Sequence, residues 1–486
     1  MRTPAAEWAG VEAREREPRC ASFRDPAGRI LLLGERVFRV VHPAAVDELE
    51  GFAQTRACCH SIETGRLVRT HMLTDSEARA VAAVDGGRIL EHERIPFASY
   101  PYEWPAEMLC AAGTLTLDLA GSLLAEGYGL KDATPYNVLF QGPRPVFVDW
   151  LSFEKRDPQD PTWLAYAQFC RCFLLPLASN KHLGVPLDQL LLGRRDGVEP
   201  EEAYRWAGPL RRWFPPFLTL ATIPVWLSAS RNCADAGVYR KRRFQDAERA
   251  QFVLRGLFGR LRRILSRLAP EEDRSSRWSG YMEQGVSYST TQLAAKAEFV
   301  ERTLEEFRPG WVLDAGANTG YFSAVAARRG GRVVAIDSDP VAAGRAWRRA
   351  WRQDLDILPL VVNLARPSPP TGWRNSECPS FLERARGRFD TVLMLALLHH
   401  LLVSERVPLE EVVDLAAELT RDLLVIEYVG TGDPMFRRIT RGREDLHRGL
   451  TQESFEQACS CRFEIVRSRQ LEGMDRCLYA MRKRTA

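Results

Sequence analysis

The sequence predicts an α/β protein in which a C-terminal, Rossmann-like sheet of seven strands follows an α+β part of similar size. Residues 312–340 read strand, glycine turn, helix, strand and acid, which is the first βαβ unit of an open parallel sheet. Five further apolar runs follow that unit before the C-terminus. Short strand patterns before residue 100 and helical patterns from residue 106 onward indicate the α+β fold ahead of it.

The turn of this unit carries the residues that a nucleoside site needs. Gly316 and Gly320 lack a β-carbon, so the backbone can turn sharply and approach a ligand closely. Asn318 stands between them, and asparagine is among the residues that best tolerate a positive φ. Asp314 ends the first strand, and Asp337 ends the second, 17 residues after Gly320. A carboxylate at that strand end can accept both ribose hydroxyl hydrogens, so the unit predicts nucleoside binding.

The spacing D-x-G-x-N-x-G differs from the dinucleotide fingerprint G-x-G-x-x-G, because Asn318 stands where the second glycine would be. It resembles the first motif of class I S-adenosylmethionine (SAM) methyltransferases, whose loop holds an amino-acid tail and needs no pyrophosphate cradle. That resemblance implies SAM as the cofactor, bound by Asp314, Gly316, Asn318, Gly320 and Asp337. The alternative is an ordinary βαβ turn of another Rossmann-like protein.

Later strands extend the same sheet. Apolar runs predict strands at 358–362, 389–398 and 423–428, and an antiparallel pair at 463–467 and 478–481 that closes the sheet.

Three residues at predicted strand ends are further candidates under this resemblance. Asn363 follows the third strand, where related proteins touch adenine. His399 and His400 follow the fourth strand near the place of the methyl group, and a neutral imidazole can take a proton from an acceptor. A histidine that only shapes the pocket is the alternative, since many methyltransferases need positioning more than a base.

A helical segment, residues 278–307, leads into the sheet. In this group of methyltransferases such a segment often closes over the cofactor, so Tyr281, Tyr288 and Lys296 are candidate lid residues. Packing and surface roles are the alternative.

A second polar pattern lies in the N-terminal part. Asp132 and Asn137 have the spacing D-x-x-x-x-N, a short hairpin pattern follows, and Asp149 ends it. This resembles the catalytic loop and the metal-binding aspartate of protein-kinase-like phosphotransferases. The resemblance implies Asp132 as the base, Asn137 and Asp149 as Mg²⁺ ligands, and Mg-ATP as a further cofactor if the site is active.

The sequence departs from the kinase pattern in several ways. Leu130-Lys131 replaces the usual histidine, and no glycine stands two residues after Asp149. No glycine-rich phosphate loop or convincing strand lysine precedes residue 100, although Arg39 or Arg69 could substitute for that lysine. A degenerate kinase-like module, or a chance spacing beside a hairpin, is the alternative to a working phosphotransferase.

We therefore expect two domains. A kinase-like α+β domain should cover residues 1–270, strand-rich at about 22–100 and helical at about 106–270. A methyltransferase domain should cover residues 277–486, after a polar linker at 270–276.

The segment 240–267 combines ten Lys and Arg residues with an apolar face. Helical spacing predicts that this face consists of Phe252, Val253, Leu257, Leu261, Ile264, Leu265 and Leu268. A basic amphipathic helix can lie on RNA or a membrane, but a packed helix with a solvated face is commoner.

Composition narrows the class of protein. The chain has 45% hydrophobic and 27% charged residues, which is typical of a globular protein. A net charge of +4 predicts no polyanion partner for the whole chain, so nucleic acid is not expected. No run of 18 apolar residues and no signal peptide is visible, and the 11 scattered cysteines fit reduced thiols. These features favour a cytoplasmic protein.

Taken whole, the chain resembles bacterial fusions of a kinase-like half with a methyltransferase half, a group that includes nodulation-associated proteins. Three functions follow as hypotheses. The first is a methyltransferase acting on a small-molecule or glycan acceptor that the N-terminal half recruits or orients. The second is a bifunctional phosphotransferase-methyltransferase, and the third is a non-enzymatic SAM-binding scaffold.

Overall fold

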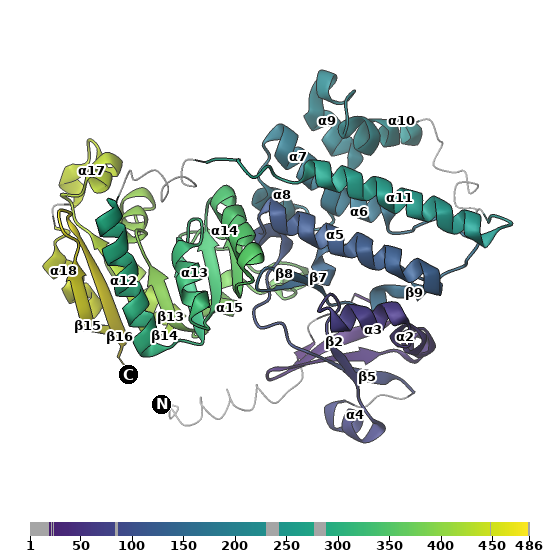
Figure 1. The fold of residues 1–486 in the computed structure, drawn as a ribbon, viewed down its shortest axis with the longest axis horizontal. Helices are drawn as coiled ribbons and strands as arrows, with labels where there is room; N and C mark the ends of the chain where they lie inside the picture. The colour runs from purple at the N-terminus through teal and green to yellow at the C-terminus, as the bar shows by residue number, and fades with distance from the viewer. Residues whose placement is uncertain are drawn as a thin grey trace.

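The computed structural model describes residues 19–20, 22, 24–82, 86–229, 243–276, 288–447 and 449–484. One part is built on the C-terminal sheet, and the other combines a small sheet with many helices (Figure 1).

The C-terminal sheet has seven strands, and this confirms the predicted Rossmann-like fold class. Their order is β12-β11-β10-β13-β14-β16-β15, in which the first five are parallel and β16 runs antiparallel to both neighbours. The order reverses between β10 and β13, so a crevice is expected at the carboxyl ends of these two strands. The strands are β10 (Trp311–Ala315), β11 (Arg332–Asp337), β12 (Ile357–Val361), β13 (Phe389–Met394), β14 (Thr420–Val429), β15 (Phe463–Gln470) and β16 (Arg476–Lys483).

Helices cover both faces of this sheet. α12 (Thr290–Phe307) and α13 (Tyr321–Arg328) belong to the apolar cluster on one face, and α16 (Leu409–Leu419) and α18 (Gln452–Ser460) belong to the cluster on the other. α14 (Pro340–Gln353) packs beside β12 at the edge. The connections contain α15 (Phe381–Ala385) and α17 (Pro434–Thr440).

The N-terminal part begins with a five-stranded antiparallel sheet in the order β1-β2-β3-β5-β4. β2 and β3 form an antiparallel hairpin that turns at Gly34. The strands are β1 (Arg19–Cys20), β2 (Gly28–Leu33), β3 (Arg36–Val41), β4 (Thr70–Met72) and β5 (Arg88–His92). The helices among them are α2 (Val46–Ala53), α3 (Arg56–Glu63) and α4 (Asp75–Val81).

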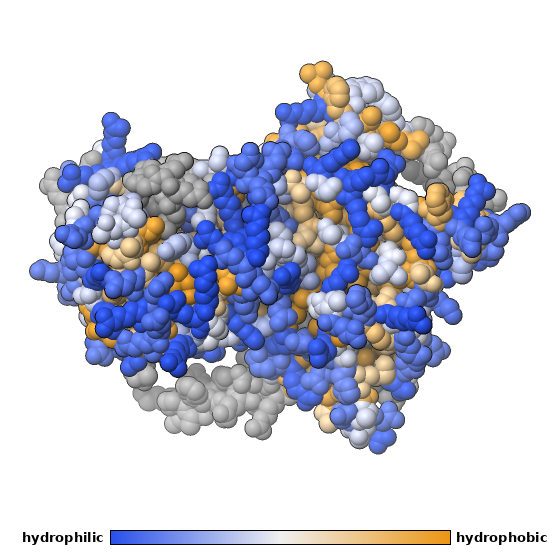
Figure 2. Space-filling model, in the orientation of Figure 1, coloured by the Kyte–Doolittle hydropathy of each residue, from blue (hydrophilic) through white to orange (hydrophobic). Residues whose placement is uncertain are grey.

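A helical region follows, centred on α5 (Ala106–Leu123). Two short antiparallel pairs stand at its edge: β6 (Tyr128–Leu130) with β9 (Phe153–Lys155), and β7 (Val138–Gln141) with β8 (Arg144–Phe147). The other helices are α6 (Tyr166–Phe169), α7 (Leu175–Leu183), α8 (Leu187–Gly193), α9 (Pro200–Arg211), α10 (Ile223–Ala229) and α11 (Ala247–Leu268). Exposed apolar side chains gather over α9 and α10, at the top of Figure 2.

α5 and α11 lie side by side (Figure 1). By length and composition alone, the segment from Ala106 to Glu126 is the one described helix that could cross a membrane, but 67% of its apolar window is buried inside the protein. The basic helix α11 packs on α5 through Ala250, Leu254, Phe258, Leu261, Leu265 and Leu268. The predicted apolar face was therefore wrong at Phe252 and Val253, which are 77% and 41% exposed, since the buried stripe runs through their neighbours.

The two parts of the chain pack against each other. Arg384 of α15 pairs with Glu103, and their side chains are 9% and 0% exposed. The ring of Phe97 lies 6.1 Å from that of Phe381 and 6.0 Å from that of Phe389. One apolar cluster continues through both parts. The domain boundary near residue 270 stays a prediction, and separating the parts there would expose this interface.

Candidate active site

The loop after β10 has the backbone that its sequence predicts. Gly316, Asn318 and Gly320 have φ values of 75°, 49° and 72°, so the asparagine holds a left-handed position between two glycines. A β-carbon at Gly320 would lie 3.0 Å from the β-carbon of Ala346, and one at Gly316 would lie 3.3 Å from the side chain of Leu397. At either glycine a side chain would crowd a neighbour and strain a backbone with positive φ.

Asp337 joins this loop to the end of β11. Its Oδ2 accepts a hydrogen bond from the Asn318 N–H at 2.8 Å, and its Oδ1 accepts one from the Asp339 N–H at 2.8 Å. Burial raises the pKa of Asp337 to about 6. Each carboxylate oxygen can still accept a further hydrogen bond, which suits the two hydroxyls of a ribose.

A cavity of about 280 Å³ opens at the carboxyl ends of the strands. Of the predicted cofactor residues, the lining includes Asp314, Gly316, Asn318, Asp337 and Asn363. It also contains His400, Tyr288 and Lys296, and residues that sequence reasoning missed: Ala317, Tyr321, Phe322, Ile336, Ser338, Val362, Leu364, Leu395, Ala396, Leu397, Leu401, Ser404 and Glu405. Gly320 is not a lining residue and acts through the turn.

Asp314 is a buried residue that holds the loop through a hydrogen bond. Its side chain is 2% exposed, and its Oδ2 accepts a hydrogen bond from the Ser323 hydroxyl at 2.6 Å. Burial raises the pKa of this carboxyl to about 6. The loop and the start of α13 are therefore fixed to the end of β10 by one buried carboxyl.

The two histidines occupy different places. His400 lines the cavity, whereas His399 is fully buried and is not a lining residue. Within the described part of the chain, neither ring nitrogen of His399 has a hydrogen-bond partner. Burial, with His400 beside it, holds the pKa of His399 well below its ordinary value, so this ring stays neutral. Of the two, only His400 can meet an acceptor in the cavity.

Ala396 carries a backbone feature that the sequence did not signal. Its φ is 54°, which an alanine rarely adopts and which costs roughly 1–3 kcal/mol. This residue follows β13 and lines the cavity, so the strain lies at the strand end that borders the cavity.

A buried cluster of charged side chains stands behind the cavity wall. Glu427 of β14 lies 2.6 Å from Nζ of Lys296, and the Tyr288 hydroxyl donates to its other oxygen at 2.7 Å. Arg476 pairs with Asp433 at 2.7 Å and approaches Glu427 at 3.5 Å. We call Tyr288, Lys296, Glu427, Asp433 and Arg476 the Tyr288 cluster. Its two cations balance its two carboxylates.

Two of the three predicted lid residues lie at the cavity. Tyr288 and Lys296 line the cavity, and the cluster holds both in place. Tyr281 lies outside the described residues.

The second predicted constellation also comes together, but with an arginine in it. Asp149 pairs with Arg39 of β3 at 2.7 Å and accepts a hydrogen bond from the Ser152 hydroxyl at 2.6 Å. Asn137 donates to that same hydroxyl at 2.9 Å. Burial raises the pKa of Asp132, and the negative charge of Asp149 raises it further.

Arg39, rather than Arg69, is the cation of this constellation. The side chain of Arg39 is 8% exposed, whereas that of Arg69 is 75% exposed and lies 3.8 Å from Glu93. Nε of Arg39 donates to His92 at 3.3 Å, and burial lowers the pKa of His92 to about 3. Among the described residues, no group of three or more His, Cys, Asp or Glu is arranged to hold a metal ion.

The fold and the cavity define a SAM-dependent methyltransferase. A family model for a methyltransferase domain matches residues 286–442. The chain belongs to the family of nodulation protein NoeA of Rhizobium meliloti (strain 1021), with 33% identity over 483 residues that cover 97% of this chain and 98% of that protein.

Two solved methyltransferase structures match part of this chain with low TM-scores. N-methyltransferase NodS from Bradyrhizobium japonicum WM9, in complex with S-adenosyl-L-homocysteine, is 17% identical and covers 43% of this chain and 94% of its own, with a TM-score of 0.32. The bifunctional kinase-methyltransferase WbdD is 16% identical and covers 40% of this chain and 39% of its own, with a TM-score of 0.29. The acceptors of such distant proteins do not carry over to this chain.

SAM affinity is expected to fall as the pH drops through about 6, because Asp337 has a raised pKa of about 6 and protonation removes the charge that a ribose hydroxyl would meet. The dissociation constant should rise by up to about tenfold per pH unit below that value. In the unliganded protein the sign is opposite: the raised pKa stabilises the fold below about pH 4, and this contribution is lost as the pH rises through about 6. Calorimetry across this range checks the affinity. Asp337→Asn should flatten the profile, and an unchanged profile would assign the titration to Asp314 instead.

Proposed function

We propose that the chain transfers the methyl group of SAM to a small-molecule or glycan acceptor, and that the N-terminal part recruits or orients this acceptor. Bound SAM supplies a methyl group on a positively charged sulfur. The residues of the chain bind and orient: Asp337 and Asn318 hold the nucleoside end, and Asn363 reaches its base. His400 is the group that we assign to take a proton from the acceptor.

The N-terminal part is assigned to acceptor binding, and not to phosphate transfer, because of the ion pair between Arg39 and Asp149, which are 2.7 Å apart. A Mg²⁺ ion needs several hard oxygen ligands around it. Arg39 and Ser152 already occupy the two oxygens of Asp149, and the Asn137 amide is turned to Ser152. This arrangement favours an N-terminal part that binds without transferring phosphate.

A bifunctional phosphotransferase-methyltransferase is the second candidate. The sheet order β1-β2-β3-β5-β4, the following helical region and the grouping of Asp132, Asn137 and Asp149 support a kinase-like fold. Arg39 lies on β3, the strand on which protein kinases carry their phosphate-binding lysine. If Arg39 turned from Asp149 toward a nucleotide, the metal positions would open.

A loop of the methyltransferase part supports a shared acceptor. It starts at Asn363 in the SAM cavity and reaches Glu377, which pairs with Arg24 at 2.6 Å and with Arg195 at 3.0 Å. The guanidinium of Arg195 lies 4.7 Å from the ring centre of Tyr136, inside the loop between Asp132 and Asn137. The loop thus runs from one candidate site to the other.

Methyl transfer is expected to be independent of Mg-ATP. The full chain, methyl-labelled SAM and a cell extract are incubated with and without Mg-ATP, and label in small molecules and glycans is measured. Equal labelling, also in Asp149→Asn, is the expected result, because Asp149 serves Arg39 and not a metal. Asp337→Ala is the control that should lose label. Label that requires ATP and disappears in Asp149→Asn would establish the bifunctional enzyme instead.

A further inference from the structure

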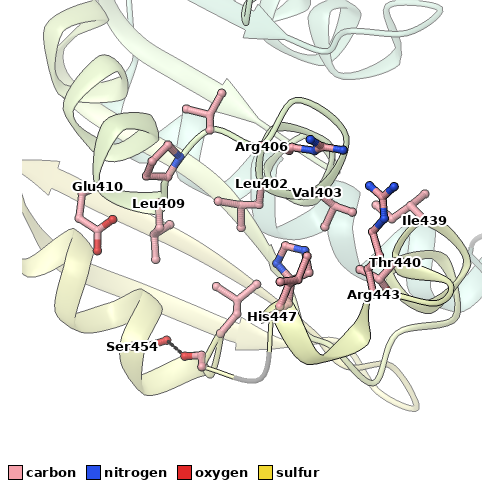
Figure 3. A pocket seen from close by; sticks show the side chains of 15 residues that line it. Leu402, Val403, Arg406, Leu409, Glu410, Ile439, Thr440, Arg443, His447 and Ser454 are labelled. Carbon is pink, nitrogen blue, oxygen red and sulfur yellow. Dashed lines mark hydrogen bonds between the residues drawn. The ribbon is translucent and has the colours of Figure 1, made fainter.

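A second, larger hollow lies in the C-terminal part of the chain, and Figure 3 shows the residues that line it. Its volume is about 800 Å³, within the range of small-molecule sites. It lies between the segment after β13 and the segment that connects β14 to α18. We call it the lateral groove, lined by Leu402, Val403, Arg406, Val407, Pro408, Leu409, Glu410, Ile439, Thr440, Arg443, Leu446, His447, Gly449, Leu450 and Ser454.

One helical turn, His400–Ser404, separates the lateral groove from the SAM cavity. His400, Leu401 and Ser404 line the cavity, whereas Leu402 and Val403 line the groove. A molecule in the groove would therefore lie one turn of backbone away from the SAM cavity.

The groove has a cationic end and an apolar middle. Arg406 and Arg443 lie toward the same side in Figure 3, and Glu410 lies at the opposite side. Arg406 has a φ of 58°, an unusual backbone conformation at the groove wall. Neither arginine forms an ion pair with an acidic side chain in the described part of the chain.

Apolar side chains make up much of the remaining lining. Leu402, Leu409 and Ile439 contribute to it, and Leu446 at the rim is 76% exposed. Apolar side chains beside guanidinium groups that form no ion pair match a ligand that is apolar and anionic at once.

We propose that the lateral groove binds the methyl acceptor, and that this acceptor carries a phosphate or sulfate monoester on an aliphatic body. The oxyanion lies between Arg406 and Arg443, and the aliphatic body lies along Leu402 and Leu409. This inference rests on the proposed methyl transfer and adds the substrate class to it.

The test uses the full chain saturated with S-adenosylhomocysteine and three probes: octyl phosphate, octyl glucoside and inorganic phosphate. Calorimetry should show one octyl phosphate per chain and binding of the other two at least about tenfold weaker, because each carries half of the recognised chemistry. The double variant Arg406→Gln/Arg443→Gln should weaken octyl phosphate roughly 100-fold. Arg437→Gln/Arg438→Gln, with the same loss of charge on α17 outside the groove, should not change it.

Several results would overturn the inference. Equal affinity of both double variants for octyl phosphate would show that Arg406 and Arg443 do not bind it. If inorganic phosphate bound as tightly as octyl phosphate, the apolar side chains would have no part in recognition. Association with phosphatidylglycerol vesicles that octyl phosphate does not compete would mean a membrane surface instead. Octyl phosphate should also inhibit labelling of the extract; binding without inhibition would make the groove something other than the acceptor site. If no label appeared in the extract while octyl phosphate still bound, the proposed methyl transfer would be contradicted, but the binding site in the groove would not.

Discussion

Asp337→Ala is expected to weaken SAM binding by about 100-fold or more. The substitution removes two hydrogen bonds to a charged acceptor, each worth about 1.5–3 kcal/mol. It also leaves the Asn318 and Asp339 N–H groups without the carboxylate that they now share at 2.8 Å each. Calorimetry with SAM measures the loss.

Two further variants separate binding from folding. Asp337→Asn keeps the size of the side chain but offers only one acceptor oxygen. Its affinity for SAM should therefore lie between that of Asp337→Ala and that of the unaltered chain. Asp422→Ala removes an acid near the amino end of β14, where it faces Arg482 at 3.3 Å, and should bind SAM normally. Equal SAM affinity in Asp337→Ala and the unaltered chain would reject the assignment of this cavity.

The cofactor loop was predictable because its determinants are local. Two glycines, an asparagine and an acid lie within one strand-turn-helix-strand unit, and each has a backbone or hydrogen-bonding role that its residue type dictates. The strands of the sheet were predictable for a similar reason, because each is an apolar run of its own, and right-handed connections between such runs leave few ways to build a parallel sheet.

The Tyr288 cluster was not predictable in the same way. Tyr288 and Arg476 are 188 positions apart, and no spacing rule links them. The available signal was a glutamate, Glu427, inside the apolar run at 423–429, since a buried carboxylate needs a partner. Sequence reasoning offered Tyr288 and Lys296 as lid candidates because both stand in the segment 278–307 that leads into the sheet, and it had no signal for their contacts with Glu427.

For His399 and the N-terminal constellation, residue spacing did not reveal which other side chains surround each residue in the fold. Adjacent histidines at a strand end look equivalent in sequence, but the turn buries His399 and presents His400 to the cavity. In the N-terminal part, Asn137 and Asp149 have the kinase-like spacing and lie near each other, since both form hydrogen bonds with the Ser152 hydroxyl. Whether a metal can enter depends on Arg39, which comes from a distant strand.

Glu427→Ala is expected to lower the free energy of unfolding by about 3–5 kcal/mol, because it leaves Lys296 buried without its carboxylate. The side chains of Lys296 and Glu427 are 2% and 0% exposed, so water cannot replace the lost partner. Urea unfolding measures the effect. Glu305→Ala, which breaks the exposed pair with Arg329 at 2.7 Å, is the control and should cost less than about 1 kcal/mol.

The pH dependence of this pair has a defined sign. Burial alone would raise the pKa of Glu427, but Lys296 and Arg476 bring it below its ordinary value. Stability from Glu427 is therefore present above the pKa that it has in the unfolded chain and is lost as the pH falls through the lower value of the folded state. Glu427→Ala should remove this part of the acid dependence.

A double variant decides between a paired charge and a general packing role. Lys296→Met/Glu427→Leu removes both charges and keeps most of the volume, so it should be less destabilised than the sum of the single variants Lys296→Met and Glu427→Leu. It should still bind SAM more weakly than the unaltered chain, because Tyr288 loses the hydrogen bonds of 2.7 Å and 3.0 Å that fix its hydroxyl at the cavity wall. Additive losses would show that the two side chains act independently, and the cluster would then be a set of separate contacts rather than one support for the cofactor cavity.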